Sequence, residues 1–349
     1  MTGDGTQSNP YTVASVSDFR ALDDKNGYVV MTDDVDFNSS GGRESFSSVA
    51  CSGAVYFDGQ GHIIRNFYQE TSGDGGLFKK FKGTFENCRI SDAYILSTGS
   101  GYVGIITNSV SEGCIFSNVT ITGMVNGTSG NSYTGGFGGK ADKNITFTDC
   151  KSILNIHARY FAGGFFGDAI YSSSSGYTNF KNCVSACRIY NGKSVGGYIG
   201  NASTNSDFYF DGCISQCDFR GGTKQSGFMY NRYAKYTNCA SICTMTGASY
   251  AYGITDKARD CIQSYSKCIF DGCMNTYGIG DGPKNQSYAA CTLKNVPEGA
   301  ANYGLGSGDN YISYYDSDIF AATEGGTGGA ASTAQLKSAE WLREQGWAI

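Results

Sequence analysis

The stretch Phe180-Lys181-Asn182-Cys183-Val184-Ser185-Ala186-Cys187-Arg188-Ile189 contains the pattern from which the fold follows. From Cys183 onward the side-chain pattern repeats with a period of two residues, which is typical of a β-strand. An aromatic residue lies three positions before Cys183. Asn182, a residue type that tolerates left-handed or tight-turn backbone, lies one position before it. This order of aromatic residue, turn residue and cysteine recurs along the chain about every 30 residues.

Seven positions follow this order, and the steps between them are 31, 31, 33, 30, 26 and 34 residues. The cysteine-like positions are Cys88, Val119, Cys150, Cys183, Cys213, Cys239 and Cys273. The residues three positions earlier are all aromatic, namely Phe85, Phe116, Phe147, Phe180, Phe210, Tyr236 and Phe270. Seven aromatic residues in one register indicate a structural repeat.

A second register lies between these positions and consists of a glycine followed by an apolar residue. Its members are Gly76-Leu77, Gly104-Ile105, Gly136-Phe137, Gly164-Phe165, Gly197-Tyr198, Gly227-Phe228 and Gly253-Ile254, with Gly278-Ile279 and Gly304-Leu305 as its continuation. Each unit therefore reads as a glycine turn, an apolar strand, a polar loop, and the aromatic, turn and cysteine positions.

One unit of about 30 residues cannot bury its apolar face alone, so several copies must stack. Stacking places each residue above its equivalent at the ~4.8 Å spacing of paired strands. We therefore predict an all-β fold, a single-stranded parallel β-helix or solenoid of about 8–9 coils over residues 71–310. Phenylalanine then stacks on phenylalanine, cysteine on cysteine and asparagine on asparagine. Nine coils would give a rod of roughly 45 Å.

The two ends do not follow the repeat and are expected to close it. Residues 1–70 should form an N-terminal cap with the first strands, because a solenoid needs a terminal unit that covers its core. Strands are expected at 11–13, 28–31 and 63–67, and a short helix at 17–22. Residues 311–349 should form a glycine-rich linker and a closing helix, with Ser332 as its N-cap and with Leu336, Ala339, Trp341, Leu342 and Trp347 available for packing.

The 14 cysteines are expected to be reduced thiols that pack as small apolar side chains. The pairs Cys183/Cys187, Cys213/Cys217 and Cys239/Cys243 lie four residues apart, which in a straight strand is ~13 Å. That separation exceeds the ~7 Å limit for a disulfide between Cα atoms. Cysteines of neighbouring coils could reach one another, so disulfides between coils remain the alternative.

Composition excludes several classes of protein. The 349 residues include 50 glycines and carry a net charge of −5, which argues against a nucleic-acid-binding face. No window approaches the ~18 apolar residues of a membrane span, so we expect no membrane insertion. The start shows no export signal. We therefore expect a protein made in the cytoplasm, or a trimmed piece of an exported one.

Several stretches carry a resemblance to a known family. They are Gly3-Asp4-Gly5-Thr6, Asn9-Pro10-Tyr11, Asp33-Asp34-Val35-Asp36-Phe37, Phe57 to Asn66, Phe180 to Cys183, Val195 to Gly200 and the closing Glu344-Gln345-Gly346-Trp347. Together they resemble GLUG-type β-helix proteins over roughly residues 3–255. In that family the motif occurs in bacterial surface adhesins and beside some secreted peptidase domains. Similar stand-alone chains look like bacteriophage virion proteins. The resemblance implies a right-handed β-helix and brings no catalytic motif with it.

Residues with catalytic or metal-binding chemistry are sparse. We expect the two histidines, His62 and His157, to be structural, and no zinc motif is present. The densest carboxylates, at 23–24 and 33–36, are expected to solvate the cap and to accept turn hydrogen bonds. We therefore predict no catalytic residue, no metal site and no cofactor.

Aromatic residues outside the core columns are the remaining signal for binding. Tyr230, Arg232 and Tyr233 fall in an expected loop, and we predict them as ligand-binding residues because tyrosine can stack on a sugar ring. The alternative is that tyrosine simply suits an exposed strand surface.

The function we predict is that of a non-enzymatic structural or host-attachment β-helix on the exterior of a bacteriophage virion. It could be a tail fibre, a spike or a capsid decoration. Its partners would be other virion or surface proteins, with host surface glycans as the ligand. A homotrimer is suggested only by analogy with phage spikes. The alternatives are a bacterial cell-surface or secreted adhesin, and a polysaccharide lyase or hydrolase.

Overall fold

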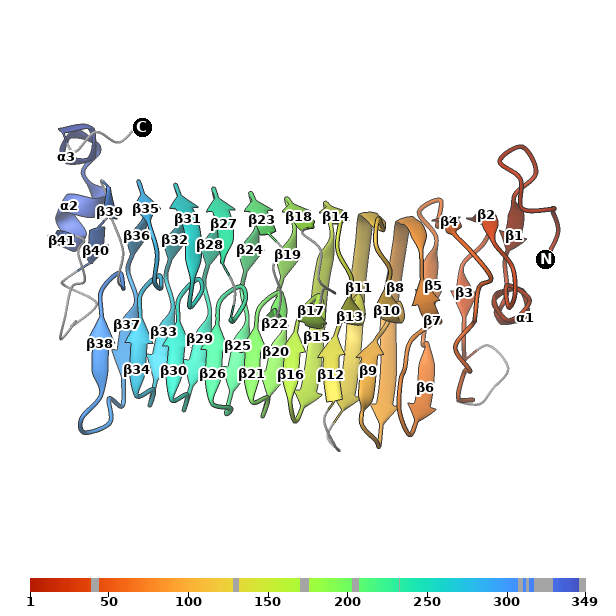
Figure 1. Cartoon of the computed structure of the whole chain (residues 1–349), viewed down its shortest axis with the longest axis horizontal. Coiled ribbons are helices and arrows are strands. Elements are labelled where there is room, and N and C mark those ends of the chain that lie inside the picture. The colour runs from red at the N-terminus through yellow and green to blue at the C-terminus, as the bar shows by residue number, and fades with distance from the viewer. Residues whose placement is uncertain are drawn as a thin grey trace.

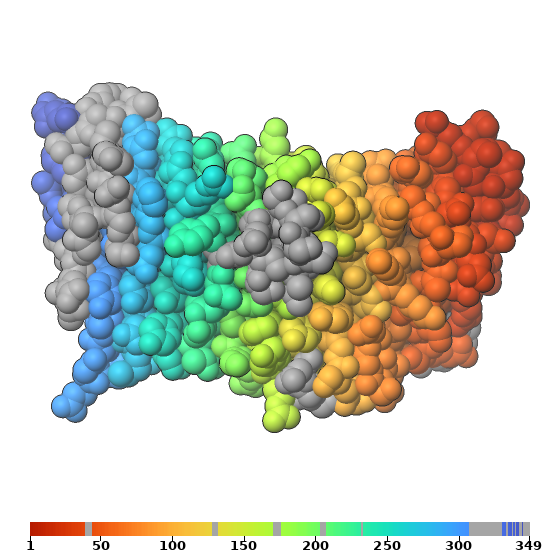
Figure 2. Space-filling model, in the orientation of Figure 1, coloured from red at the N-terminus to blue at the C-terminus, as the bar shows by residue number. Residues whose placement is uncertain are grey.

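The computed structural model describes residues 1–38, 44–127, 132–169, 176–202, 207–231, 233–306, 310–311, 314–316 and 329–344. Over these residues the chain winds into an elongated parallel β-solenoid of about nine turns, as predicted (Figure 1). Figure 2 shows the same rod filled by side chains, with the windings following one another from the N-terminal to the C-terminal end. All strand pairings among the described residues are parallel, and they form three sheets.

The largest sheet has 28 strands in three ladders, of which β8 (Gly83–Ser97), β11 (Ile115–Gly127) and β15 (Lys151–Ala158) bridge more than one. The first ladder also contains β1 (Tyr11–Val13), β2 (Gly27–Met31), β4 (Val55–Asp58), β14 (Ile145–Thr148), β18 (Tyr177–Lys181), β23 (Asp207–Asp211), β27 (Ala234–Thr237), β31 (Ala258–Ile262), β35 (Lys284–Asn285) and β39 (Asn310–Tyr311). The second also contains β3 (Val35–Asp36), β5 (Ile63–Arg65), β19 (Val184–Ser185), β24 (Ile214–Ser215), β28 (Ala240–Ser241), β32 (Tyr265–Ser266), β36 (Tyr288–Ala289), β40 (Tyr314–Asp316) and β41 (Gly329–Ala331). The third also contains β6 (Tyr68–Thr71), β20 (Arg188–Tyr190), β25 (Asp218–Arg220), β29 (Thr244–Thr246), β33 (Ile269–Asp271) and β37 (Thr292–Lys294).

Two smaller sheets run along part of the rod beside the large sheet. The eight-stranded sheet consists of β9 (Gly101–Gly104), β12 (Ser132–Gly135), β16 (Phe161–Gly163), β21 (Ser194–Gly196), β26 (Lys224–Ser226), β30 (Tyr250–Tyr252), β34 (Asn275–Tyr277) and β38 (Ala301–Tyr303). The five-stranded sheet consists of β7 (Phe78–Phe81), β10 (Thr107–Val110), β13 (Gly138–Ala141), β17 (Phe166–Ala169) and β22 (Ile199–Ala202). Figure 1 shows the eight-stranded sheet running along the rod from β9 to β38.

The aromatic column predicted from the repeat lies in the core of the first ladder. The rings of Phe147 and Phe180 stack with centroids 4.9 Å apart, and those of Phe180 and Phe210 are 4.8 Å apart. A second column, which includes Phe165 and Tyr198 at 4.8 Å, meets the first edge-on. Such mixed stacked and T-shaped contacts suit the quadrupole of aromatic rings and fill the space between the sheets.

The turn residues before the cysteine positions have left-handed backbone, as their types indicate. Asn118 has φ 52° and Asn182 has φ 53°. The Asn118 side-chain amide also donates to the Asn87 side-chain oxygen at 3.1 Å. Asparagine adopts this conformation more readily than most residues because its short side chain bonds locally. The predicted left-handed corner is therefore confirmed at Asn87, Asn118, Asp149, Asn182, Gly212 and Asn238.

The repeat register predicted for the last cysteine-like position is wrong. Tyr236 pairs with Cys261 in the next winding, whereas Phe270 pairs with Met245 in the third ladder. The winding from Tyr236 to Cys261 has only 25 residues, so the pattern of aromatic residue and cysteine at Phe270 and Cys273 belongs to another part of the winding. In the glycine register, Gly104 pairs with Gly135, one residue before the position predicted.

The glycine register from Gly136 onward marks a close approach between windings. A Cβ on Gly227 would lie 2.1 Å from the carbonyl oxygen of Gly253 and 2.2 Å from the Ser241 hydroxyl. Only glycine fits such a position, because no side-chain atom can share that space with a neighbouring backbone. The glycines thus fix how tightly successive windings stack.

All fourteen cysteines are free thiols, and thirteen of them are buried. One column contains Cys150, Cys183, Cys213 and Cys239, and another contains Cys187, Cys217, Cys243, Cys268 and Cys291. In the second column the backbone N–H of each of the first four cysteines donates to the sulfur of the next winding, for example from Cys187 to Cys217 at 3.4 Å. The thiols pack as small polarizable core groups.

The N-terminal region combines a cap with the first windings. Helix α1 (Val16–Arg20) is N-capped by Ser15, and its Phe19 lies 5.8 Å from the ring of Phe57. Phe57 in turn stacks on Phe85 at 4.6 Å. The strands predicted in this region are present, and β1, β2 and β4 already belong to the first ladder. The aromatic column therefore begins one winding before the repeat becomes visible in the sequence.

The C-terminal helix predicted after Ser332 is present but interrupted. Helix α2 (Thr333–Lys337) has Ser332 as its N-cap in a capping box with Gln335, and α3 (Ala339–Glu344) follows. The break occurs because Ser338 is extended, with ψ 110°. Trp347 and most of the glycine-rich linker lie outside the described residues.

Candidate binding surface along the rod

The structure places the predicted binding tyrosines on one edge of the rod. Tyr230 follows the bridge at Met229, and Tyr233 directly precedes β27. Tyr233 is 54% exposed and Tyr230 is half-buried. Arg232, the third predicted residue, lies outside the described residues.

The two smaller sheets form an arch in the windings from β9 to β22, and isolated bridges at Met229 and Thr255 continue its returning side. In these windings a strand of the eight-stranded sheet is followed by the turn of the glycine register, named the glycine corner, and then by a strand of the five-stranded sheet, which returns beside it. A Cβ on Gly167 of β17 would lie 2.2 Å from the backbone nitrogen of Thr134 in β12. Each returning strand therefore packs on the strand of the preceding winding, and the ends of one sheet lie beside the beginnings of the other. This edge, opposite the glycine corner, is named the arch mouth.

Four polar side chains connect successive windings inside the arch mouth and are named the polar row: Asp168, Asn201, Asn231 and Asp256. The Asn201 side-chain amide donates to Asp168 Oδ1 at 2.9 Å, and the Asn231 amide donates to Asn201 Oδ1 at 3.3 Å. The backbone N–H of Asn231 donates to Asp256 Oδ1 at 2.8 Å. A chain of hydrogen bonds thus crosses four windings, because equivalent positions repeat at the strand spacing.

The two carboxyls of the polar row are removed from water. Asp168 is 1% exposed and Asp256 is 5% exposed. Burial raises the pKa of Asp168 to about 6, although the Asn201 amide and Lys140 favour the charged form. Burial likewise raises the pKa of Asp256 to about 6, against the Asn231 N–H and the lysines at 257 and 224. Both carboxyls therefore change protonation in mildly acidic solution.

Lysine side chains lie over tyrosine rings along the same edge. The distances from Nζ to the ring centroid are 4.5 Å for Lys224 over Tyr230, 5.1 Å for Lys193 over Tyr160, 5.5 Å for Lys140 over Tyr102 and 6.0 Å for Lys257 over Tyr233. These four lysine–tyrosine pairs flank the polar row. They span the six windings from β9 to β30, which is about 24 Å at the strand spacing. The arrangement offers aromatic faces, ammonium groups and the exposed Asn231 amide to a ligand lying along the rod.

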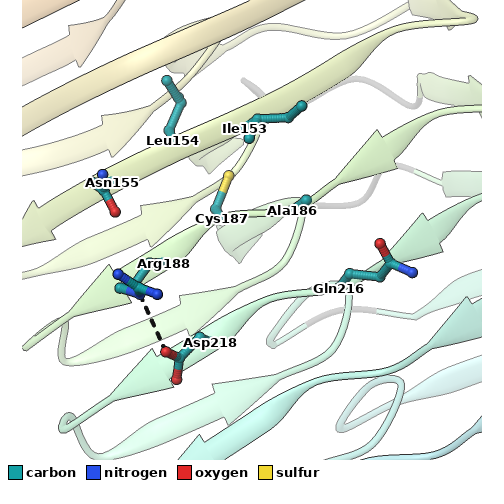
Figure 3. Close-up of a pocket in the computed structure, with 8 residues that line it drawn as sticks. All are labelled: Ile153, Leu154, Asn155, Ala186, Cys187, Arg188, Gln216 and Asp218. Atoms are coloured by element: carbon teal, nitrogen blue, oxygen red, sulfur yellow. Dashed lines mark ion pairs between the residues drawn. The ribbon is translucent and has the colours of Figure 1, made fainter.

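A depression of about 270 Å³ lies elsewhere on the rod, where the chain bends between the second and third ladders (Figure 3). Its lining includes the exposed Ile153, together with Arg188 and Asp218. Asp218 Oδ2 pairs with Arg188 at 3.3 Å and with Arg220 at 2.9 Å. Because two arginines neutralise this carboxylate, the depression offers no free acid for catalysis.

A groove of about 520 Å³ lies near the N-terminus, beside a stacked tyrosine pair. The rings of Tyr28 and Tyr56 have centroids 4.7 Å apart. Asp58 and Glu86 also line the groove and are register partners on adjacent windings. Asp58 Oδ1 accepts from the backbone of Gln60 and the side chain of Asn87, so it is engaged in a turn.

The residues predicted to be structural have partners of that kind. His62 Nδ1 lies 3.3 Å from Asp34, which also accepts from Arg65 at 2.8 Å. The ring of His157 stacks on that of Tyr190 with centroids 4.3 Å apart. Among the described residues, no group of three or more His, Cys, Asp or Glu side chains is placed to hold a metal ion. No helix in the described part of the chain is long and apolar enough to cross a bilayer.

The sequence interpretation missed the polar row and the lysines. A signal for them exists, because Lys140, Asp168, Asn201 and Asn231 follow one another at intervals of 28, 33 and 30 residues. That spacing matches the repeat. Their clustering depends on how the two smaller sheets pack across windings, which the repeat alone does not show.

Comparison with known proteins supports the fold and gives one partial sequence match. No protein-family profile matches the chain. Halomucin from Haloquadratum walsbyi is 30% identical over 173 residues, which cover 44% of this chain and 2% of halomucin. The chain therefore corresponds to a small fraction of that relative.

A solved structure from Bacteroides ovatus is similar over nearly the whole chain. It is described as that of a "putative immunoglobulin A1 protease", and it superposes with a TM-score of 0.50 at 17% identity. The match covers 98% of this chain and 89% of that one. At this identity the likeness is one of fold alone. The chain is thus a parallel β-solenoid with a lysine- and tyrosine-lined edge.

Proposed function

We propose that this β-solenoid is a non-enzymatic, surface-exposed attachment protein that binds glycans at the arch mouth. The observation that carries the proposal is the series of lysine–tyrosine pairs along the hydrogen-bonded polar row. A tyrosine ring can stack on the apolar face of a sugar, while lysines and amides bond its polar groups. Equivalent groups on successive windings suit a ligand that itself repeats.

The location we propose is the exterior of a cell or of a virion. The partial sequence match to halomucin supports an extracellular surface. The narrower assignment to a bacteriophage tail fibre, spike or capsid decoration rests on the resemblance of the sequence to stand-alone virion chains. Immunogold labelling of intact cells and of purified particles would separate the two locations. Label on neither would contradict the proposal of surface exposure.

Glycan binding is tested by a screen of immobilised glycans with the wild type and the double variant Tyr230→Ala/Tyr233→Ala. The matched control is Tyr177→Ala/Tyr209→Ala, because these tyrosines are 48% and 38% exposed on the first ladder, away from the arch mouth. We expect the first variant to lose binding and the control to retain it. Absence of binding by the wild type, or equal loss in both variants, would contradict the proposal.

One observation favours a second candidate function, that of a polysaccharide hydrolase acting in the N-terminal groove. Asp58 and Glu86 lie on adjacent windings, and the ~4.8 Å between windings is close to the ~5–5.5 Å between carboxyls in retaining glycosidases. The turn hydrogen bonds of Asp58 oppose this role. Release of reducing sugar from a polysaccharide panel, abolished by Glu86→Gln, would establish the hydrolase and refute the non-enzymatic assignment.

A further inference from the structure

The lysines of the arch mouth are positioned to meet an anion. Lys140, Lys193, Lys224 and Lys257 have no ion-pair partner within 4.0 Å among the residues that the structure describes, whereas two other lysines do. Lys143, for example, lies 3.9 Å from Glu112, and Lys235 lies 3.9 Å from Asp260. Four ammonium groups on one edge of a protein with net charge −5, facing the two buried carboxyls of Asp168 and Asp256, are a local exception to its overall charge.

The two carboxyls beneath these lysines, Asp168 and Asp256, offset only part of the charge of the four ammonium groups. Asp168 and Asp256 are turned inward and hydrogen-bonded to Asn201 and Asn231, and they stay almost completely buried. Toward solvent this edge presents the ammonium groups, each held against a tyrosine ring, together with the exposed Asp74 carboxylate, which accepts from the Tyr102 backbone N–H at 2.8 Å. Because the tyrosine ring already restricts the conformations of the lysine side chain, the lysine loses less conformational entropy when it binds a ligand.

The spacing of the pairs indicates a ligand that is both charged and repetitive. Lys193 and Lys224 come from neighbouring windings, as the backbone bond from the Lys224 N–H to the Lys193 carbonyl at 3.2 Å shows. Lys257 lies one winding further along, beyond β30. Ammonium groups thus recur at or near the ~4.8 Å winding repeat, and tyrosine faces recur with them.

We infer that the arch mouth binds an anionic polysaccharide, carboxylated or sulfated, which lies lengthwise along the rod across several windings. This inference rests on the proposed glycan-binding function and specifies its ligand class. The lysines bind the acid groups, the tyrosines contact sugar faces, and the exposed Asn231 side chain bonds hydroxyl groups. A neutral glycan would leave the ammonium groups unused. A nucleic acid would need a broader basic surface than a chain with net charge −5 provides.

The test compares two triple variants with the same change in charge. The first is Lys193→Gln/Lys224→Gln/Lys257→Gln, which removes three lysines of the arch mouth. The control removes three exposed lysines of the large sheet and its turns, namely Lys151→Gln/Lys181→Gln/Lys267→Gln. The probes are a hyaluronan oligosaccharide, a heparin oligosaccharide, a dextran oligosaccharide and a single-stranded oligothymidylate. Affinities are measured by calorimetry at several salt concentrations, and circular dichroism checks that each variant is folded.

We expect the wild type to bind hyaluronan or heparin, with an affinity that falls as salt rises, and to bind dextran far more weakly. The first variant should lose about tenfold or more in affinity, since exposed charge contacts contribute roughly 0.5 kcal/mol each and 1.4 kcal/mol corresponds to tenfold. The control should change by less than about twofold.

The other outcomes separate the inference from the function on which it rests. Salt-independent binding of dextran, with no preference for the acidic glycans, would overturn the ligand class and leave glycan attachment standing. Equal loss in both triple variants, or binding of oligothymidylate as tight as that of the acidic glycans, would also overturn it. Failure to bind any glycan in this panel or in the wider screen would instead count against the proposed function itself.

Discussion

Replacing Asp168 by asparagine should stabilise the protein at neutral pH. The carboxyl is 1% exposed, and its pKa is raised from 3.8 to about 6, chiefly by burial. Asparagine has nearly the same shape and can still accept from the Asn201 amide, but it carries no charge to desolvate. The variant therefore removes the cost of a buried charge and keeps the polar row connected.

The size and the pH dependence of this effect follow from the two pKa values. A group whose pKa is raised on folding gives its stabilising contribution below the unfolded pKa, and that contribution is lost as pH rises through the folded pKa. A shift of about 2 units corresponds to about 3 kcal/mol. The Asp168→Asn variant should thus be more stable than the wild type by up to about 3 kcal/mol at pH 7.5, and by about 0.5 kcal/mol at pH 4.

Urea denaturation followed by circular dichroism at several pH values between 4 and 7.5 measures this difference. The control is Asp211→Asn, because Asp211 is exposed on the outer face of the first ladder. The control should change the free energy of unfolding by less than about 0.5 kcal/mol at every pH. A difference for Asp168→Asn that does not vary with pH, or a variant less stable than the wild type at pH 7.5, would refute the reasoning.

Three further predictions concern the core and the corners of the windings. Phe180→Ala should lower the free energy of unfolding by about 3–5 kcal/mol, because it leaves a cavity in the aromatic column; a loss below about 1 kcal/mol in urea denaturation would contradict this. Asn182→Ala should cost about 1–2 kcal/mol by the same assay, because φ is 53°, whereas Asn182→Gly should be nearly neutral; equal effects would exclude the backbone explanation. Ellman's reagent should titrate no more than about one thiol rapidly in the native protein, namely Cys51, and all 14 after denaturation; several fast native thiols would contradict the packing of the columns.

The repeat made most of the fold predictable from the sequence. Asn182 and Phe180 indicate the same corner of the winding: Asn182 indicates its left-handed backbone, and Phe180 indicates the core position that precedes it. Their recurrence fixes which residues lie above one another. The register failed at Phe270, because the winding shortens to 25 residues after Tyr236 and a similar pattern falls in another ladder. The repeat predicts the register only while the winding length stays constant, and the loops between the short strands can change that length.

The binding surface was predictable only in part. Tyr230 and Tyr233 stood out as aromatic residues in an expected loop. Of the lysines that cover them, Lys224 lies in β26 and Lys257 directly precedes β31. They reach the two tyrosines only because neighbouring windings pack beside the loop. The burial of Asp168 is also a property of the arch. The residues next to Asp168 in the sequence do not indicate this burial, because the burial depends on contacts between windings.

The most direct test of the central claim, that equivalent side chains of successive windings lie on one another, is a pair of double-mutant cycles in the aromatic column. The stacked pair Phe147/Phe180, at 4.9 Å, should show a coupling energy of about 0.5–1.5 kcal/mol when both are replaced by leucine. The pair Phe147/Phe210, which is separated by one intervening ring, should show coupling below about 0.5 kcal/mol. Absent coupling in the first cycle, or equal coupling in both, would contradict the stacked solenoid.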